Sequence, residues 1–206
     1  MPWDLDALED DSEFAPMPDE ERARLDELGS GSFNMSCLEG PGLDCWDDPP
    51  AQPTAIVFLD IDGVLHPLDA PRELFFAPSC MAQLRRILDR SGARIVLSSS
   101  WRLTASAAEA AVKALADASI QRPIGATPEQ AQTVEETEEE RAVEISAWLS
   151  SNGDIVGQCQ WVALDDIPLE QYLPLDHVVV TDSHIGLTEE LADEAIQKLC
   201  RPASAA

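Results

Sequence analysis

Residues 54–206 consist of two kinds of apolar segment that alternate along the chain. Short continuous apolar runs, typical of strands buried on both faces of a sheet, occur at residues 55–59, 93–97, 161–166 and 177–182. Apolar residues at helical spacing predict helices at residues 79–92, 104–119, 138–151 and 188–199. Strands separated by helices pair in parallel through right-handed crossovers. The pattern therefore predicts one α/β domain with a mainly parallel sheet that is covered on both faces.

Cap and turn residues mark the ends of these elements. Ser79 and Thr104 are suited to helix N-caps, and Gly92 is suited to a helix stop. A short fifth strand is predicted at residues 122–126. Beyond it, Thr127 is suited to cap a further helix, with Pro128 at its first position.

Residues 1–53 differ in composition from the rest of the chain. They carry 15 acidic and 2 basic residues, together with the Gly/Ser run GSGS and the proline-rich DDPPAQP. Such a segment has too little apolar surface to form a core, although residues 18–28 have the pattern of one helix. We expect an acidic, largely disordered extension before the domain at 54–206, and this extension is a candidate surface for a protein partner.

The formal net charge of the chain is −26, and a field of this sign repels polyanions. Strong nonspecific binding to nucleic acid is therefore not expected. The five cysteines are widely spaced and form no CxxC pair, which favours reduced thiols over disulfides or a zinc site. No apolar run approaches the roughly 20 residues that cross a bilayer, and the acidic N-terminus is unlike a secretory signal. These features predict a cytoplasmic protein without membrane contacts.

Residues that carry chemistry gather at the carboxyl ends of the predicted strands. Asp60 and Asp62 follow the first strand, Ser98–Ser100 the second, and Asp165 and Asp166 the third. Open parallel sheets bind their ligands at this edge. Carboxylates brought together there repel one another and raise one another's pKa values unless a cation neutralises them. A hard divalent ion is expected, and Mg2+ fits best because it accepts a few carboxylates together with water and phosphate oxygens.

Five stretches of the sequence resemble the haloacid dehalogenase-like (HAD) hydrolases: VFLDIDGVLHP, IVLSSSWR, RAVEISAWL, VALDD and VVVTDSHIGLT. The resemblance covers about residues 54–200. It is closest to the small HAD domain that occurs within bacterial multidomain RNA-repair proteins. It implies an HAD-like Rossmannoid fold, a three-layer α/β/α sandwich, and a Mg2+-dependent phosphatase that forms an aspartyl-phosphate intermediate.

The resemblance also implies a role for each acidic residue. Asp60 would be the nucleophile that attacks phosphorus. Asp62 would first protonate the leaving oxygen and then activate water as a general base. The metal would be held by the Asp60 side chain, the Asp62 backbone carbonyl, and Asp165 or Asp166. Gly63 permits the tight loop that follows Asp62.

Phosphate contacts are implied at the second strand and at a later helix. A serine after the second strand would hydrogen-bond a phosphoryl oxygen; Ser98 and Ser99 both qualify, and Ser99 is favoured. Arg141, at the head of its helix, would supply the cation against the phosphate, with Arg102 as an auxiliary contact. The commoner family pattern has lysine at the position of Arg141, where arginine offers the charge and a planar fork.

About 16 residues separate Asp62 from the helix near Ser79, which is too few for a helical cap domain. An uncapped site admits bulky phosphorylated substrates but leaves the substrate unidentified. Two other functions stay open: a non-catalytic interaction module on the same fold, and a phosphatase for nucleic-acid ends, against which the charge argues. His66 has two interpretations, a contact to the substrate and a packed residue of the loop. Trp101 and Trp148 are interpreted as packing residues.

Overall fold

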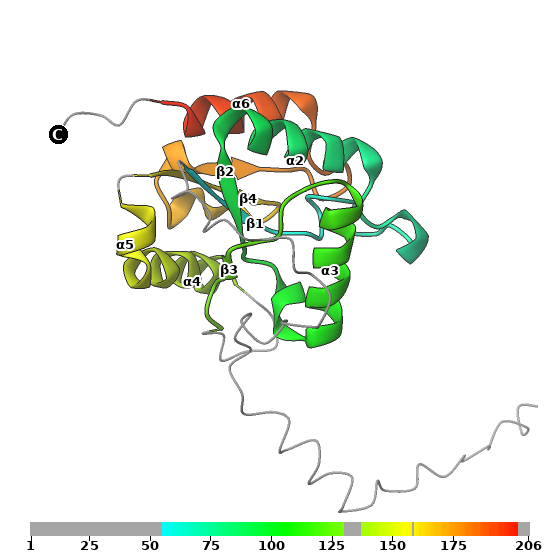
Figure 1. Ribbon diagram of the computed structural model, residues 1–206, viewed down its shortest axis with the longest axis horizontal. Helices are drawn as coiled ribbons and strands as arrows, with labels where there is room; N and C mark the ends of the chain where they lie inside the picture. Colours follow the sequence, from blue (N-terminus) through cyan, green and yellow to red (C-terminus); the bar gives the residue numbers. More distant parts are fainter. Residues whose placement is uncertain (1–54, 130–136, 158, 202–206) are drawn as a thin grey trace, which may run out of the picture. The chain divides into compact units, whose positions relative to one another are not determined.

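The computed structural model describes residues 55–129, 137–157 and 159–201. Within these residues the strands form one parallel sheet in the order β3-β2-β1-β4-β5 (Figure 1). The strands are β1 (Ala55–Leu59), β2 (Ala93–Leu97), β3 (Gly125–Ala126), β4 (Gln160–Asp165) and β5 (Val178–Val180). The α/β fold that the apolar pattern predicts is confirmed.

Helices cover both faces of this sheet. They are α2 (Pro78–Ser91), α3 (Ala105–Asp117), α4 (Glu138–Ser151), α5 (Gly153–Val156) and α6 (Glu189–Leu199). Shorter 3-10 turns are η2 (Arg72–Leu74), η3 (Ser100–Leu103), η4 (Leu169–Gln171) and η5 (Leu175–His177). One core contains residues of α2, α3 and α6, and a second core contains residues of α4 and η4. Figure 1 shows α2 and α6 on one side of the sheet and α4 on the other.

The central strand β1 is buried on both faces. Val57 and Leu59 belong to the core beneath α2, α3 and α6, whereas Ile56 and Phe58 belong to the core beneath α4. Because successive side chains of a strand point to opposite faces, every residue of such a strand must be apolar. Trp148 of α4 packs edge-on against Phe58 with ring centroids 5.5 Å apart, which confirms it as a packing residue.

The bounds of α4 are as predicted because a capping box fixes its first turn. The Thr137 hydroxyl accepts a hydrogen bond from Glu140 N, and the Glu140 carboxylate accepts one from Thr137 N. Thr127, predicted to cap a helix, is buried instead, and its hydroxyl donates to the carbonyl of Leu97. Residues 128–129 are not helical, and the remainder of that predicted helix lies outside the described residues.

The start of α2 also differs from the prediction. The helix begins at Pro78 with Ala77 as its N-cap residue, so the assignment of Ser79 as the cap is wrong. Proline is suited to the first position of a helix because its φ angle is already helical and it lacks the N–H that would have no partner there. The predicted stop is confirmed, since Gly92 ends α2 with φ 67°.

The order of the strands reverses at the carboxyl end of β1. From β1 the chain builds outward through β2 and β3 on one side, and then returns to add β4 and β5 on the other. Ligands of open α/β sheets bind where the strand order reverses in this way. Between β1 and α2 the described chain contains η2 as its one named element, so no cap domain is inserted there.

Two further predictions concern the chain as a whole. The acidic extension of residues 1–53, with its helix at 18–28, lies outside the described residues and stays a prediction. Among the helices that the structure describes, none combines the length and the apolar character needed to cross a bilayer.

Candidate active site

The strand register brings three of the predicted site residues to one edge of the sheet. The leucines that precede Asp60, Ser98 and Asp165 are aligned with one another across β1, β2 and β4. Asp60 N donates to a carbonyl of β4, and Ser98 N donates to a carbonyl of β1, each at 3.0 Å. The pairing therefore continues one residue beyond the strands, and these side chains leave the sheet next to one another.

Arg141 lies in the first turn of α4 and forms ion pairs with two of these acids. Its Nη1 atom donates to Asp60 Oδ1 at 3.1 Å and to Asp165 Oδ2 at 2.7 Å. All three side chains are buried. Because α4 is fixed by its capping box, the guanidinium is held between the ends of β1 and β4. The cation predicted for this position is therefore at the site, while its contact with phosphate stays a prediction.

Asp60, Asp165 and Asp166 form a cluster that could hold a metal ion. One carboxylate oxygen of each lies within 4.8 Å of the others. Burial raises the pKa of Asp60, and it raises the pKa of Asp165 to about 8, although Arg141 opposes both effects. Burial and the neighbouring Asp60 also raise the pKa of Asp166. The negative charge is thus not balanced by Arg141 alone, and an all-oxygen donor set of this kind fits a hard divalent cation.

The Asp62 side chain has different partners. His66 Nε2 lies 3.0 Å from Asp62 Oδ1, and Trp101 Nε1 donates to Asp62 Oδ2 at 2.8 Å. Burial acts to raise the pKa of Asp62, but the hydrogen bonds from His66 and Trp101 outweigh it and hold that pKa below its ordinary value. Two aspartates separated by one residue therefore have pKa values shifted in opposite directions in the metal-free state.

His66 and Trp101 are the site residues that sequence reasoning missed. The sequence left His66 between two interpretations and assigned Trp101 to packing, a role it also has, since its ring lies edge-on to Phe75 and Phe76. Two local signals point to these residues. His66 follows Asp62 by four residues in the same loop, and Trp101 adjoins the serines at the end of β2.

The two candidate serines are both buried, and the structure gives a contact that separates them. A hydrogen bond from the Ser99 side chain to Asp60 helps to lower the pKa of that acid. The Ser99 hydroxyl also accepts a hydrogen bond from Trp101 N at 3.4 Å. This geometry favours Ser99, as the sequence does, and the contact of either serine with phosphate stays a prediction.

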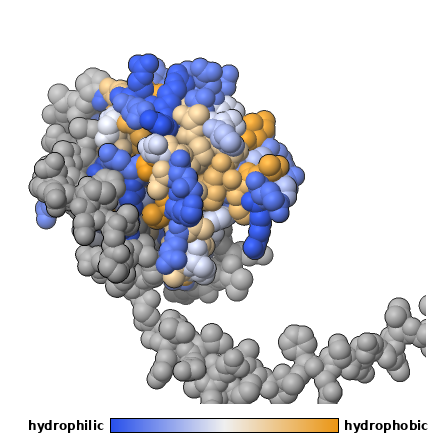
Figure 2. Space-filling view, turned by 45° about the vertical axis from the view of Figure 1, so that its right-hand side comes forward, coloured by the Kyte–Doolittle hydropathy of each residue, from blue (hydrophilic) through white to orange (hydrophobic). Residues whose placement is uncertain are grey.

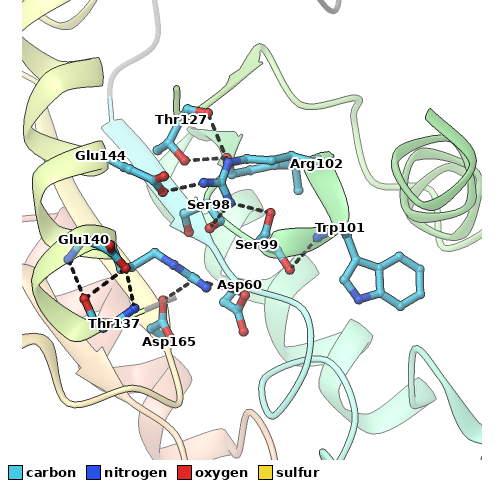
Figure 3. A network of polar contacts seen from close by, with 12 residues as sticks. Asp60, Ser98, Ser99, Trp101, Arg102, Thr127, Thr137, Glu140, Glu144 and Asp165 are labelled. Atoms are coloured by element: carbon cyan, nitrogen blue, oxygen red, sulfur yellow. Dashed lines mark hydrogen bonds and ion pairs between the residues drawn. The ribbon is translucent and has the colours of Figure 1, made fainter. Parts of the chain in front are cut away.

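Arg102 faces the protein interior (Figure 3). Its guanidinium pairs with Glu144 of α4 and donates to the carbonyls of Thr127 at 3.1 Å, Ser98 at 3.0 Å and Ser99 at 2.8 Å. These charge-assisted bonds hold the loop formed by Ser98 and Ser99 against α4. The geometry assigns Arg102 to positioning this loop, and it does not support the auxiliary phosphate contact that the sequence predicts.

A family model described as "HAD domain in Swiss Army Knife RNA repair proteins" matches residues 56–192, which is more than half of the chain. The chain belongs to this HAD family. The resemblance to HAD hydrolases of the RNA-repair type is confirmed by this match, which includes every candidate site residue. No curated protein and no solved structure gives a significant match.

Gly63 of the HAD domain faces Asp166 across the site. Its φ is +70°, and a Cβ atom added there would lie 2.8 Å from Asp166 Cβ and closer still to the carboxylate. We expect Gly63→Ala to lower the free energy of unfolding by about 2 kcal/mol, because the conformation is strained for alanine and the site is overpacked. The substitution should also weaken Mg2+ binding, since Asp166 must move. Urea unfolding and calorimetric titration with Mg2+ measure the two effects.

Gly153 supplies the control for this substitution. A Cβ atom added to Gly153 meets no heavy atom within 4 Å. Gly153→Ala should therefore change the free energy of unfolding by less than about 0.5 kcal/mol and leave Mg2+ binding unchanged. If Gly63→Ala bound Mg2+ as tightly as the unaltered HAD domain, Asp166 would not belong to the metal site.

Mg2+ binding to the HAD domain should depend on pH. Because burial raises the pKa of Asp165 from 3.8 to about 8 in the metal-free state, a metal ion bound to this acid competes with a proton near neutral pH. The Mg2+ affinity should rise by up to about tenfold per pH unit towards pH 8. In the same window the stability of the metal-free domain falls as pH rises, because the folded state binds this proton more tightly than the unfolded state does.

Calorimetric titration at neutral pH in buffers with different ionisation enthalpies measures this exchange directly. We expect release of about one proton for each Mg2+ bound by the unaltered domain. Asp165→Asn should bind Mg2+ more weakly and release no proton from this position. An affinity that is independent of pH between 6 and 8 would contradict the assignment of Asp165 as a metal ligand.

Proposed function

We propose that this HAD domain is a Mg2+-dependent phosphohydrolase that cleaves a phosphate monoester through an aspartyl-phosphate on Asp60. The observation that carries the proposal is the pairing of two unlike aspartates at the end of β1. Asp60 is buried against Arg141 and the acidic cluster, whereas Asp62 is half-exposed and bound by His66 and Trp101. The first arrangement suits a nucleophile, and the second suits an acid and base that must reach the leaving group.

In the first step an Asp60 oxygen attacks phosphorus while the bond from phosphorus to the ester oxygen breaks. The ester oxygen takes a proton from Asp62 and leaves as an alcohol. In the second step water attacks the phosphoryl group, Asp62 takes a proton from that water, and the bond between phosphorus and Asp60 breaks. Asp60, Asp165 and Asp166 would hold Mg2+, which would supply positive charge against the developing charge of the reaction.

The remaining side chains prepare Asp60 for this attack. Arg141 offsets the charge of Asp60 and Asp165, which would otherwise repel an incoming phosphate. Ser99 hydrogen-bonds Asp60 and would donate to a phosphoryl oxygen beside it. Arg102 and Glu144 keep the backbone of Ser99 in position. Each of these groups is held before substrate arrives, so little reorganisation accompanies the reaction.

A phosphate-release screen tests the proposal. The panel contains p-nitrophenyl phosphate, phosphorylated metabolites, nucleotides, and oligonucleotides with a terminal phosphate, each with Mg2+ and with EDTA. Asp60→Asn serves as the blank. Release from at least one substrate that needs both Mg2+ and Asp60 supports the proposal. The absence of release from every member of the panel contradicts it.

A nucleic-acid end is the second candidate substrate. The description of the matching family, which concerns RNA-repair proteins, favours it. Against it, residues 54–206 contain 24 acidic and 11 basic residues, a balance that disfavours broad contact with a polyanion. A single terminal phosphate at the site needs no such contact. If this is the substrate, kcat/KM for an oligonucleotide phosphate should exceed the value for p-nitrophenyl phosphate by at least about tenfold.

The competing proposal is a non-catalytic module that binds a protein partner through the acidic extension. On the described residues, large exposed apolar side chains are spread over several elements, and the face in Figure 2 mixes hydrophilic with hydrophobic surface. Dispersed apolar residues of this kind are ordinary on a protein surface. A partner is therefore proposed for residues 1–53 alone, and loss of binding on removing them would support it.

A further inference from the structure

The carboxylate of Asp62 is held at both of its oxygens by side chains from different elements. His66, in the loop after β1, lies 3.0 Å from Oδ1, and Trp101, in η3 after β2, donates to Oδ2 at 2.8 Å. The torsion that turns a carboxylate about its Cβ–Cγ bond is otherwise broad, with two equivalent orientations. Two hydrogen bonds to separate oxygens restrict this rotation and fix the plane of the group.

The tautomer of His66 follows from its second contact. Its Nδ1 atom accepts a long hydrogen bond, 3.5 Å, from Phe76 N. The ring proton is therefore on Nε2, and His66 donates to Asp62. Phe76 adopts φ 56°, a left-handed conformation that is uncommon for a bulky residue, and its N–H points at the histidine. The backbone thus accepts some strain at the point where it orients His66.

Aromatic packing leaves His66 a single orientation. The imidazole is fully buried and stacks on Phe75, with ring centroids 4.2 Å apart and an interplanar angle of 20°. Phe76 lies tilted beside it at 5.8 Å, and Trp101 lies edge-on at 6.4 Å. Trp101 in turn contacts both phenylalanines. The two donors of Asp62 therefore belong to one packed cluster that also includes the segment following η2.

We propose that His66 and Trp101 are positioning residues for Asp62, and that they fix the direction in which its carboxyl group delivers a proton to the leaving oxygen. The inference rests on the proposed function. Neither residue gains or loses a proton in the reaction: both donate hydrogen bonds throughout, while the transferred proton passes from Asp62 to the ester oxygen. A carboxyl group that rotates freely would meet that oxygen in a productive alignment less often.

This role predicts a dependence on the leaving group that a purely structural role lacks. The p-nitrophenolate ion is stable and leaves without needing a proton. The phenolate ion, which leaves from phenyl phosphate, depends more strongly on receiving a proton. The alkoxide ion, which leaves from an alkyl phosphate, depends on it most strongly. Impaired alignment of Asp62 should therefore lower kcat/KM, which reports cleavage of the ester bond, most for an alkyl phosphate and least for p-nitrophenyl phosphate.

The test compares Trp101→Phe, His66→Leu and His66→Gln with the unaltered chain. The three substrates are p-nitrophenyl phosphate, phenyl phosphate and an alkyl phosphate. Trp101→Phe and His66→Leu each remove a donor and keep an apolar side chain at that position. Each should lower kcat/KM by about 10- to 100-fold for the alkyl ester and by less than about threefold for p-nitrophenyl phosphate. His66→Gln places an amide N–H where the ring Nε2 lies, and it should recover most of the loss. Trp148→Phe, a packing tryptophan on α4, is the matched control and should affect all three esters alike.

The outcomes separate the inference from the proposed function. If the unaltered chain hydrolyses no phosphate ester, the proposed function fails and the inference fails with it. If the unaltered chain is active but Trp101→Phe lowers kcat/KM equally for the three esters, the inference alone is overturned. Circular dichroism monitors the fold of each variant. If His66→Leu does not fold, the kcat/KM values of Trp101→Phe for the three esters test the inference.

Discussion

Asp60→Asn is expected to abolish turnover of every phosphate ester, with a loss in kcat of about 10^4-fold or more. An amide has the shape of the carboxylate but cannot attack phosphorus, so no aspartyl-phosphate forms. Rapid quenching with acid after mixing with labelled substrate should trap phosphoprotein from the unaltered chain and none from Asp60→Asn. Retention of more than about a tenth of the activity would show that another group is the nucleophile.

The fold should survive this substitution, which makes the loss of activity interpretable. Asp60 and Asp165 are both buried, and the charge of Asp60 contributes to the raised pKa of Asp165. Neutralising Asp60 removes that repulsion, and the weaker pairing with Arg141 offsets part of the gain. We expect the midpoint of thermal unfolding in EDTA to stay within a few degrees of the unaltered value. Asp117→Asn, at an exposed acid paired with Lys113, is the matched control and should change neither activity nor stability.

The acidic site could be read from the sequence because it depends on local features. Asp60 and Asp165 each follow an apolar run directly, and the ends of parallel strands meet at one edge of a sheet whatever the details of packing. The same holds for Ser98 and Ser99. The fold was predictable for a related reason, since alternating strand and helix signals leave few topologies open. The continuous apolar run of β1 predicts a fully buried strand, and the structure confirms it.

One missed contact, between His66 and Asp62, is local in sequence, whereas two others join residues that are distant in sequence. Trp101 binds Asp62 across 39 residues, and Arg102 pairs with Glu144 across 42 residues. An arginine beside two candidate phosphate-binding serines favours a phosphate contact as long as its partner is unknown. That partner lies in a helix whose first turn is a run of glutamates, and the sequence does not distinguish the buried Glu144 from these glutamates, none of which is buried. Tertiary packing decides which of these charges is buried.

Arg141→Met is expected to have the largest effect on stability. The substitution removes the cation between Asp60 and Asp165 and leaves two buried acids without their partner. Breaking a buried ion pair in this way costs about 3–5 kcal/mol, which urea unfolding in EDTA would measure. Mg2+ should restore part of the loss, because it neutralises the same acids. Arg85→Met, at an exposed pair with Asp89, is the control and should cost less than about 1 kcal/mol.

Arg141→Lys separates the charge of this residue from its shape. The ion pairs with Asp60 and Asp165 are both made by the single atom Nη1, so the planar fork of arginine is not what joins these acids. A lysine ammonium that reached the same point would replace them. We therefore expect Arg141→Lys to stay within about 1 kcal/mol of the unaltered stability and to keep activity within about tenfold, whereas Arg141→Met keeps neither. If the lysine and methionine variants lost stability equally, the charge between the two acids would not be what Arg141 contributes, and its role would lie in packing within the first turn of α4.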